Sequence, residues 1–110
     1  MIAYDDFLRV DVRAGTVLAA EPLAGARKPA YVLRIDFGPE LGERRSSAQI
    51  SGRYAAAELV GTQVCAVVNF PPKRIAGVES QVLVLGMDDA DGNVIVVRPT
   101  FPVPNGRRLY

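Results

Sequence analysis

The side chains best suited to a chemical role in this sequence are cations, which stand in short groups. Arg44, Arg45 and Arg53 make up one group, and Lys73 and Arg74 make up another. Guanidinium and ammonium groups donate strong, charge-assisted hydrogen bonds to phosphate oxygens. Neutral hydrogen-bonding side chains stand close to both groups in the sequence: Ser46, Ser47, Gln49, Asn69 and Ser80. This combination indicates a surface that binds phosphate and sugar groups.

The net charge of the chain is only +1, so this hypothesis depends on how folding distributes the charges. The carboxylates concentrate in other segments, namely Asp5 and Asp6, Glu40 and Glu43, and Asp88, Asp89 and Asp91. A cationic face opposite these segments would bind a nucleic-acid backbone despite the small net charge. Aromatic residues are too few to stack successive bases of a single strand, so the shape and backbone of a folded RNA fit better. The alternative is that Lys73 and Arg74 are ordinary cations on a solvated turn.

These two cations lie in the stretch "NFPPKRIAGVES", residues 69–80, which separates two apolar runs. Its two prolines have fixed φ angles and no N–H, so they end the preceding strand and stiffen the connection. A stiff backbone that presents two cations loses less entropy when it binds a ligand. Phe70 and Pro71 mark the expected position of an apolar groove for unfolded polypeptide.

The sequence argues against an enzyme and against a bound metal or cofactor. It contains no histidine, which removes Ser-His-Asp catalysis and most zinc sites. Its single cysteine, Cys65, lies in the apolar run "VCAVV" and is expected to be a buried thiol. The carboxylates lack a paired acid–base setting. The stretch "DDADGN" invites comparison with a calcium loop, but it lacks the later glutamate of an EF-hand and is better explained as a hairpin turn.

Short apolar runs alternate with turn signals along the chain, which is typical of an all-β protein. Tyr31, Leu33, Ile35 and Phe37, for example, recur at every second position and are expected to face a core. Gly15 is expected to mark a bulge that bends its strand. The expected strands are residues 9–21, 30–38, 44–50, 62–70, 80–88 and 94–99, with one helix at 51–61. We predict a single domain, residues 1–110, that forms a small closed five-stranded OB-fold barrel with one short helix; an SH3-like barrel and a small sandwich are the alternatives.

Both ends of the chain carry more large apolar side chains than a barrel of this size can bury. They are Tyr4, Phe7, Leu8, Phe101, Val103, Leu109 and Tyr110. We predict that these N- and C-terminal segments are dimerisation segments, which cover a second copy of the chain in a symmetric homodimer. The alternative is that they pack on the barrel of the same chain.

The sequence offers no signal for export or for membrane insertion. The N-terminal stretch "MIAYDDFL" is acidic where a secretory signal is basic. No apolar run approaches the roughly 20 residues that span a bilayer. We therefore expect a cytoplasmic protein without membrane insertion.

Several stretches together resemble the tRNA-binding-domain family, which includes C-terminal domains appended to some methionyl-tRNA synthetases. They are "DVRAGTVLAAEPLAGARKPAYVLRIDFG", "RRSSAQI", "ELVGTQVCAVVNFPPKRIAGVESQVLVLG" and "FPVPNG", within residues 7–106. "SSAQI" and "NFPPKRIAG" are most similar to the bacterial export-chaperone branch of this family. Val82 and Leu83, where many relatives have Gly and Met, and "GARKP", where many relatives have an acidic segment, also favour that branch.

The resemblance implies an OB-fold homodimer that binds tRNA by its structure rather than by its sequence and binds preproteins as a chaperone. By position, it implies an RNA surface made of Arg44, Ser46, Ser47, Gln49, Asn69, Lys73, Arg74 and Ser80. Asp11 and Arg13 match the opening pattern of the family and are expected to form an internal ion pair. The implied partners are a second copy of the chain, tRNA, unfolded preproteins and the export translocase ATPase. The alternative function is a tRNA-binding docking module for an aminoacyl-tRNA synthetase.

Overall fold

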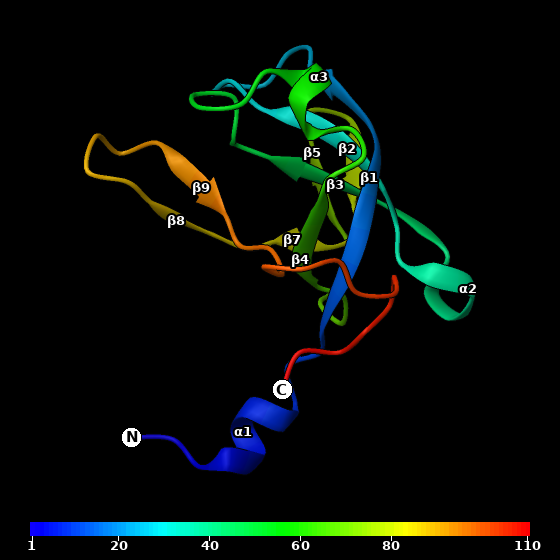
Figure 1. The fold of residues 1–110 in the computed structure, drawn as a ribbon. Coiled ribbons are helices and arrows are strands. Elements are labelled where there is room, and N and C mark those ends of the chain that lie inside the picture. Colours follow the sequence, from blue (N-terminus) through cyan, green and yellow to red (C-terminus); the bar gives the residue numbers. More distant parts are fainter.

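A computed structural model describes residues 1–110 and contains nine strands and three short helices (Figure 1). The strands are the elements that the alternation of apolar residues favours. The helices are α1 (Tyr4–Leu8), α2 (Gly38–Leu41) and α3 (Ala56–Leu59). The strands are β1 (Val12–Pro22), β2 (Tyr31–Asp36), β3 (Glu43–Ala48), β4 (Gln63–Val67), β5 (Lys73–Ile75), β6 (Val78–Ser80), β7 (Leu83–Val84), β8 (Gly86–Asp88) and β9 (Val94–Val96). None of the helices combines the length and the apolar character that crossing a membrane requires.

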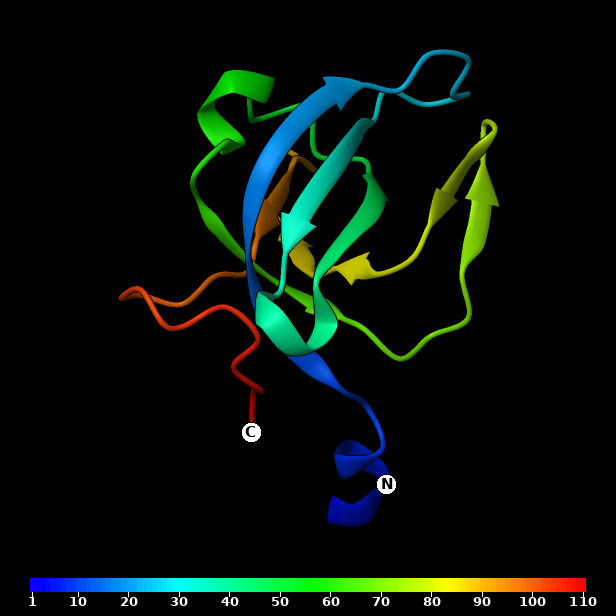
Figure 2. The ribbon, with the colours of Figure 1, turned by 90° about the vertical axis from the view of Figure 1, so that its right-hand side faces the viewer.

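The long strand β1 organises the barrel, since its two halves pair with different neighbours. Residues 12–16 pair with β4, and residues 16–22 pair with β2. Together with β3 and β7, these strands form an antiparallel five-stranded sheet in the order β3-β2-β1-β4-β7. The sheet curls until its two edge strands approach each other (Figure 2). This arrangement confirms the prediction of an all-β, OB-like barrel of five strands.

The bend in β1 occurs at a different residue from the one expected. The register of β1 with β2 shifts between Val17 and Ala19, so the irregularity lies at Leu18 rather than at Gly15. Gly15 lacks a side chain for another reason, because a Cβ atom there would lie 2.6 Å from Cγ2 of Ile35. The glycine therefore permits the close approach of β1 and β2, which a sequence alone does not distinguish from a bulge.

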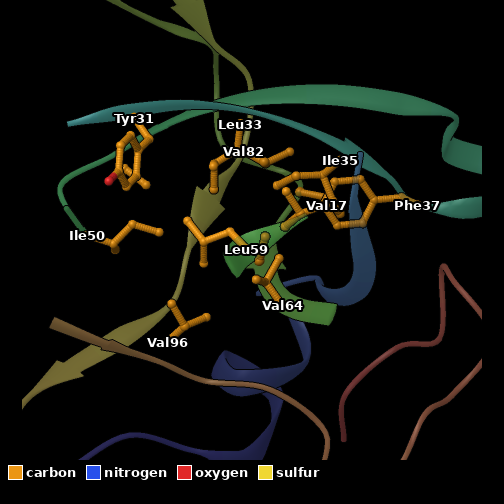
Figure 3. Packing of buried hydrophobic residues seen from close by; sticks show 13 residues of the cluster. Val17, Tyr31, Leu33, Ile35, Phe37, Ile50, Leu59, Val64, Val82 and Val96 are labelled. Atoms are coloured by element: carbon orange, nitrogen blue, oxygen red, sulfur yellow. The ribbon is translucent and has the colours of Figure 1, made fainter. Parts of the chain in front are cut away.

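One face of each barrel strand lines the core (Figure 3). Leu33, Ile35 and Phe37 are fully buried, as their alternation predicts, and they belong to one cluster with Val64 of β4. Helix α3 lies at one end of the barrel, where Leu59 is fully buried (Figure 1). Alternation therefore decides which side chains of each strand remain free to meet a ligand on the outside.

The outer face of β1 and β4 carries a second, smaller apolar cluster made of Val12, Cys65 and Val67. Cys65 is a buried free thiol, as expected, and burial raises its pKa. Because the thiolate is the reactive form of cysteine, a raised pKa makes this side chain a poor nucleophile at neutral pH.

The helices and the hairpins differ more from expectation than the barrel strands do. The expected helix at 51–61 is limited to α3, because Gly52 disfavours a helix and residues 51–53 form a turn first. Helices α1 and α2 are additional, and a proline in its first turn favours α2. The stiff connection after the two prolines contains the hairpin β5–β6. The expected strand at 80–88 is divided into β7 and β8, and β8 forms the expected hairpin with β9.

The turn of the β5–β6 hairpin contains a strained residue. Ala76 has a φ of 48° and Gly77 a φ of 81°, as both central residues of a type I′ turn require. Alanine is disfavoured in this left-handed conformation, which asparagine adopts more easily. We expect Ala76→Asn to raise the free energy of unfolding, measured by chemical denaturation, by about 1 kcal/mol. Gly77→Ala should lower it, and a loss of stability in Ala76→Asn would contradict the strain.

Candidate nucleic-acid interface

Strand β3 divides the expected RNA contacts between the two faces of the barrel. Arg45 and Ser47 point outward, whereas Ser46 lies between them with 0% of its surface exposed. Arg44 is on the same face as Ser46 and is half-buried, and its guanidinium donates to the carbonyl oxygen of Leu41 at 3.2 Å. The expected contact of Ser46 with RNA is therefore corrected, because alternation directs its hydroxyl into the protein.

A groove of about 770 Å³ lies over the outer face of β3, and we call it the cationic groove. One wall is the β1–β2 loop, which contributes Arg27 and Lys28. The other wall is the β5–β6 hairpin, which contributes Lys73. Ser47 and Gln49 line the groove between the two walls. Figure 2 shows the loop and the hairpin extending on the same side of the barrel.

The cations of this groove have no anionic partner in the protein. The four ion pairs of the structure use other cations, so Arg27, Lys28, Lys73 and the neighbouring Arg45 remain unpaired. No carboxylate lines the groove. Its positive potential is therefore available to an anion from outside, and phosphate groups satisfy such donors well.

Arg34, which stands opposite Arg45 on β2, is already paired. Its guanidinium donates to both carboxylate oxygens of Glu43, each at 2.9 Å. These hydrogen bonds hold the pKa of Glu43 below its ordinary value. The pair thus stays charged at neutral pH and contributes no net charge to the surface.

The β5–β6 hairpin presents its two cations on opposite faces. Lys73 and Ile75 both line the cationic groove, and Arg74 between them faces the other way because strand residues alternate. The guanidinium of Arg74 donates to the carbonyl oxygen of Gly77 at 2.8 Å. Its partner across the hairpin is Glu79. The structure thus brings Lys73, but not Arg74, into the groove.

Two further expected RNA contacts have roles inside the protein. The side-chain oxygen of Asn69 accepts from the Asp11 N–H at 3.0 Å, and its amide nitrogen donates to the carbonyl oxygen of Arg9 at 2.8 Å. Ser80 is buried, and its hydroxyl oxygen accepts from the Ser47 N–H at 3.0 Å. Asn69 therefore anchors the N-terminal segment and Ser80 supports β3, and neither side chain lines the cationic groove.

Arg53 lies by the β8–β9 hairpin and does not line the cationic groove. Its guanidinium is 3.9 Å from a carboxylate oxygen of Asp89. That carboxylate accepts from the N–H groups of Asn93 and Asp91, which holds the pKa of Asp89 below its ordinary value. The acidic stretch is thus a hydrogen-bonded hairpin turn.

A second groove of about 290 Å³ adjoins the first, and we call it the apolar groove. Its apolar lining consists of Phe70, Pro71, Ile75, Val82 and Leu83. Phe70 and Leu83 are 51% and 49% exposed, and together they form an exposed apolar patch on the groove. Phe70 and Pro71, which the sequence suggests for polypeptide binding, therefore border a real concavity.

The two chain ends meet at the end of the barrel that lies away from the loop and the hairpin (Figure 2). Arg13 pairs with Asp11 at 2.6 Å, as expected. Arg108 also pairs with Asp11, at 3.5 Å, and donates to the carbonyl oxygen of Leu8 at 2.7 Å. Arg108 therefore helps to hold the two chain ends together and does not extend the cationic groove.

Arg27 and Lys28 are the groove residues that the sequence-based site lacks. They stand in a loop between two strands, where no periodicity marks a binding face. The expected fold itself contains the missing signal, because the loop after the first strand is one of the two that bind ligands in OB barrels.

These features define an oligonucleotide-binding type of barrel. The cationic groove lies over the third strand, between the loop after the first strand and the long connection that precedes the fifth, and these are the two loops that flank the ligand site of OB barrels. The chain belongs to the family described as "Putative tRNA binding domain", which matches residues 12–108.

Two solved structures are similar over essentially their whole length. The chaperone CsaA of Bacillus anthracis is 51% identical, with a TM-score of 0.93 over 100% of this chain and 99% of that chain. The CsaA chaperone protein of Picrophilus torridus is 44% identical, with a TM-score of 0.93 and 100% of both chains covered. The methionine–tRNA ligase of Porphyromonas gingivalis is 41% identical over 108 residues, which are 98% of this chain but only 15% of that enzyme.

The side-chain amide of Asn69 binds the N-terminal segment, whereas that of Gln49 lines the cationic groove, and this difference can be tested. We expect Asn69→Ala to lower the free energy of unfolding by about 1–2 kcal/mol, because it removes two hydrogen bonds to the N-terminal segment. Its affinity for tRNA should stay close to that of the unchanged protein. Gln49→Ala is the matched control and should weaken tRNA binding without loss of stability. Denaturant titration and filter binding measure the two properties, and the reverse pattern would contradict this assignment.

Proposed function

We propose that this protein is a non-catalytic, homodimeric, chaperone-like protein that binds tRNA in the cationic groove and unfolded preproteins in the apolar groove. The observation that carries the proposal is the set of unpaired cations on both walls of a groove at the ligand-binding position of an OB barrel. Membership of the tRNA-binding-domain family and the similarity to CsaA chaperones support the two ligand classes.

The composition of the cationic groove suits the backbone of a folded RNA. Arg27, Lys28 and Lys73 offer charged donors for phosphates, and Ser47 and Gln49 offer neutral hydrogen bonds for sugars. No aromatic side chain lines the groove, so stacking of splayed bases contributes little there. These properties favour recognition of tRNA by shape and backbone over recognition of a base sequence.

Salt dependence tests the proposed phosphate contacts. We expect Lys73→Gln to weaken tRNA binding and to reduce the slope of log affinity against log salt by about one, because one fewer counterion is released. Arg74→Gln removes an adjacent charge from the other face of the hairpin and should leave the slope almost unchanged. Equal slopes for Lys73→Gln and the unchanged protein would refute the contact.

The chain ends support the proposed homodimer. Helix α1 has only five residues, contains no buried side chain and projects from the barrel (Figure 1). A helix this short is not stable by itself in water, so it needs a packing partner. Tyr4 is 69% exposed and Phe101 is 78% exposed, which argues against the alternative that they pack on their own barrel. Leu8, Leu109 and Tyr110 are also exposed, whereas Phe7 and Val103 are partly buried.

The mass in solution tests this association. We expect the unchanged protein to have twice the mass of the chain in light scattering, and a Tyr4→Ser/Phe101→Ser double variant to shift toward the single mass as apolar contacts are lost. Phe70→Ser, which changes a similarly exposed ring on the groove side, is the control and should leave the mass unchanged. A single mass for the unchanged protein would exclude the homodimer.

The apolar groove supports unfolded preproteins as a further partner, and the resemblance to export chaperones is the reason to propose the translocase ATPase. Unfolded preproteins in the cytoplasm offer exposed apolar side chains, and the export translocase ATPase would receive them. The similarity to methionine–tRNA ligases favours a second candidate, a docking module that delivers tRNA to a synthetase. The two differ in polypeptide binding, which a docking module does not need.

A further inference from the structure

The cationic and apolar grooves are not separate features, because they share part of their walls. Ser47, Lys73 and Ile75 line both of them. Lys73 is the first residue of the β5–β6 hairpin, and its exposed side chain stands where the two grooves meet. A ligand that fills either groove therefore contacts the same side chains at the junction.

The two grooves offer different chemistry on either side of this junction. One side contributes the unpaired cations Arg27 and Lys28, and the other contributes Phe70 and Leu83. No carboxylate lines either groove. Charge complementarity thus favours an extended polypeptide segment in which an apolar side chain stands next to acidic ones, and it disfavours a segment with basic neighbours.

We propose that the two grooves form one composite site in which Lys73 binds either an RNA phosphate or a carboxylate of a polypeptide, so that tRNA and polypeptide exclude each other. This inference rests on the proposed function and adds to it the chemistry of the polypeptide and a rule of competition. One ammonium group cannot serve two bulky anionic ligands, and a tRNA backbone on the cationic wall covers the entrance to the apolar groove. By linkage, each ligand lowers the apparent affinity of the other.

Direct binding of each ligand is measured first. The probes are a tRNA transcript and a short fluorescein-labelled peptide in which leucines are flanked by glutamates, with a lysine-flanked peptide as the control. We expect the tRNA and the glutamate-flanked peptide to bind, and the lysine-flanked peptide to bind at least about tenfold more weakly. Absence of tRNA binding would refute the proposed function itself. Equal binding of the two peptides would refute the proposed polypeptide chemistry alone.

Competition is then measured by fluorescence anisotropy of the bound peptide during a titration with tRNA. We expect complete displacement, with an apparent peptide Kd that rises in proportion to the tRNA concentration and reaches no plateau. A plateau, or a rise in anisotropy from a ternary complex, would overturn mutual exclusion while leaving the proposed function intact.

Substitutions of two exposed side chains, Lys73 and Phe70, test which part of the composite site each ligand uses. Lys73→Gln is expected to weaken the binding of both ligands by at least about threefold, because both use this ammonium group. Phe70→Ala is expected to weaken the peptide by at least about fivefold and to leave tRNA affinity within about twofold. Circular dichroism confirms that each variant is folded. Loss of only one ligand in Lys73→Gln would overturn the shared role of this residue, and the competition measured on the unchanged protein remains decisive if a variant unfolds.

Discussion

The binding face depends on the way in which the barrel closes at the edge of β3. β3 has no ladder of backbone hydrogen bonds to β7, although the two strands are in contact. Gln81, the residue after β6, takes part in closure instead: its side-chain oxygen accepts from the Arg45 N–H at 2.9 Å, and its backbone N–H donates to the Arg45 carbonyl oxygen at 2.8 Å. Two residues after Arg45 on the same strand, the Ser47 N–H donates to the hydroxyl oxygen of Ser80. Because Ser80 ends the hairpin and pairs with Lys73, and Gln81 follows directly, the bonds that close the barrel also fix Lys73 beside β3.

A nearly neutral protein can bind an anion because its charges are divided into paired and unpaired groups. Arg13 and Arg108 are held by Asp11, and Arg34 is held by Glu43. These pairs cancel much of the charge of the chain at places remote from the groove or at its margin. Of the cations without an ion-pair partner, Arg27, Lys28 and Lys73 line one concavity that contains no carboxylate. The local potential at that concavity, rather than the net charge of the whole chain, decides whether a polyanion approaches.

The sequence was sufficient for the barrel and for part of the site, and the missing part has physical causes. Alternation located the main strands because each has one buried face, and residues such as Leu33 and Ile35 are where it placed them. The same alternation, applied to β3, separates Ser46 from Ser47, but a list of polar residues ignores which face each one occupies. Asn69 could not be assigned from its type, because an amide on a loop can bind RNA or its own backbone equally well. The place of Arg27 in the groove emerges only when folding brings it beside Lys73, 46 residues further along the chain, and no local pattern records this.

The clasp between Asp11 and the arginines near both termini has an architectural consequence. It gathers the first and last segments at the end of the barrel opposite to the loop and the hairpin that form the walls of the cationic groove (Figure 2). A catalytic domain attached at that end of the barrel would leave the cationic groove open to solvent. A barrel with this geometry can be appended to a larger protein as a separate domain. The similar segment of the methionine–tRNA ligase, which is 15% of that enzyme, is consistent with this.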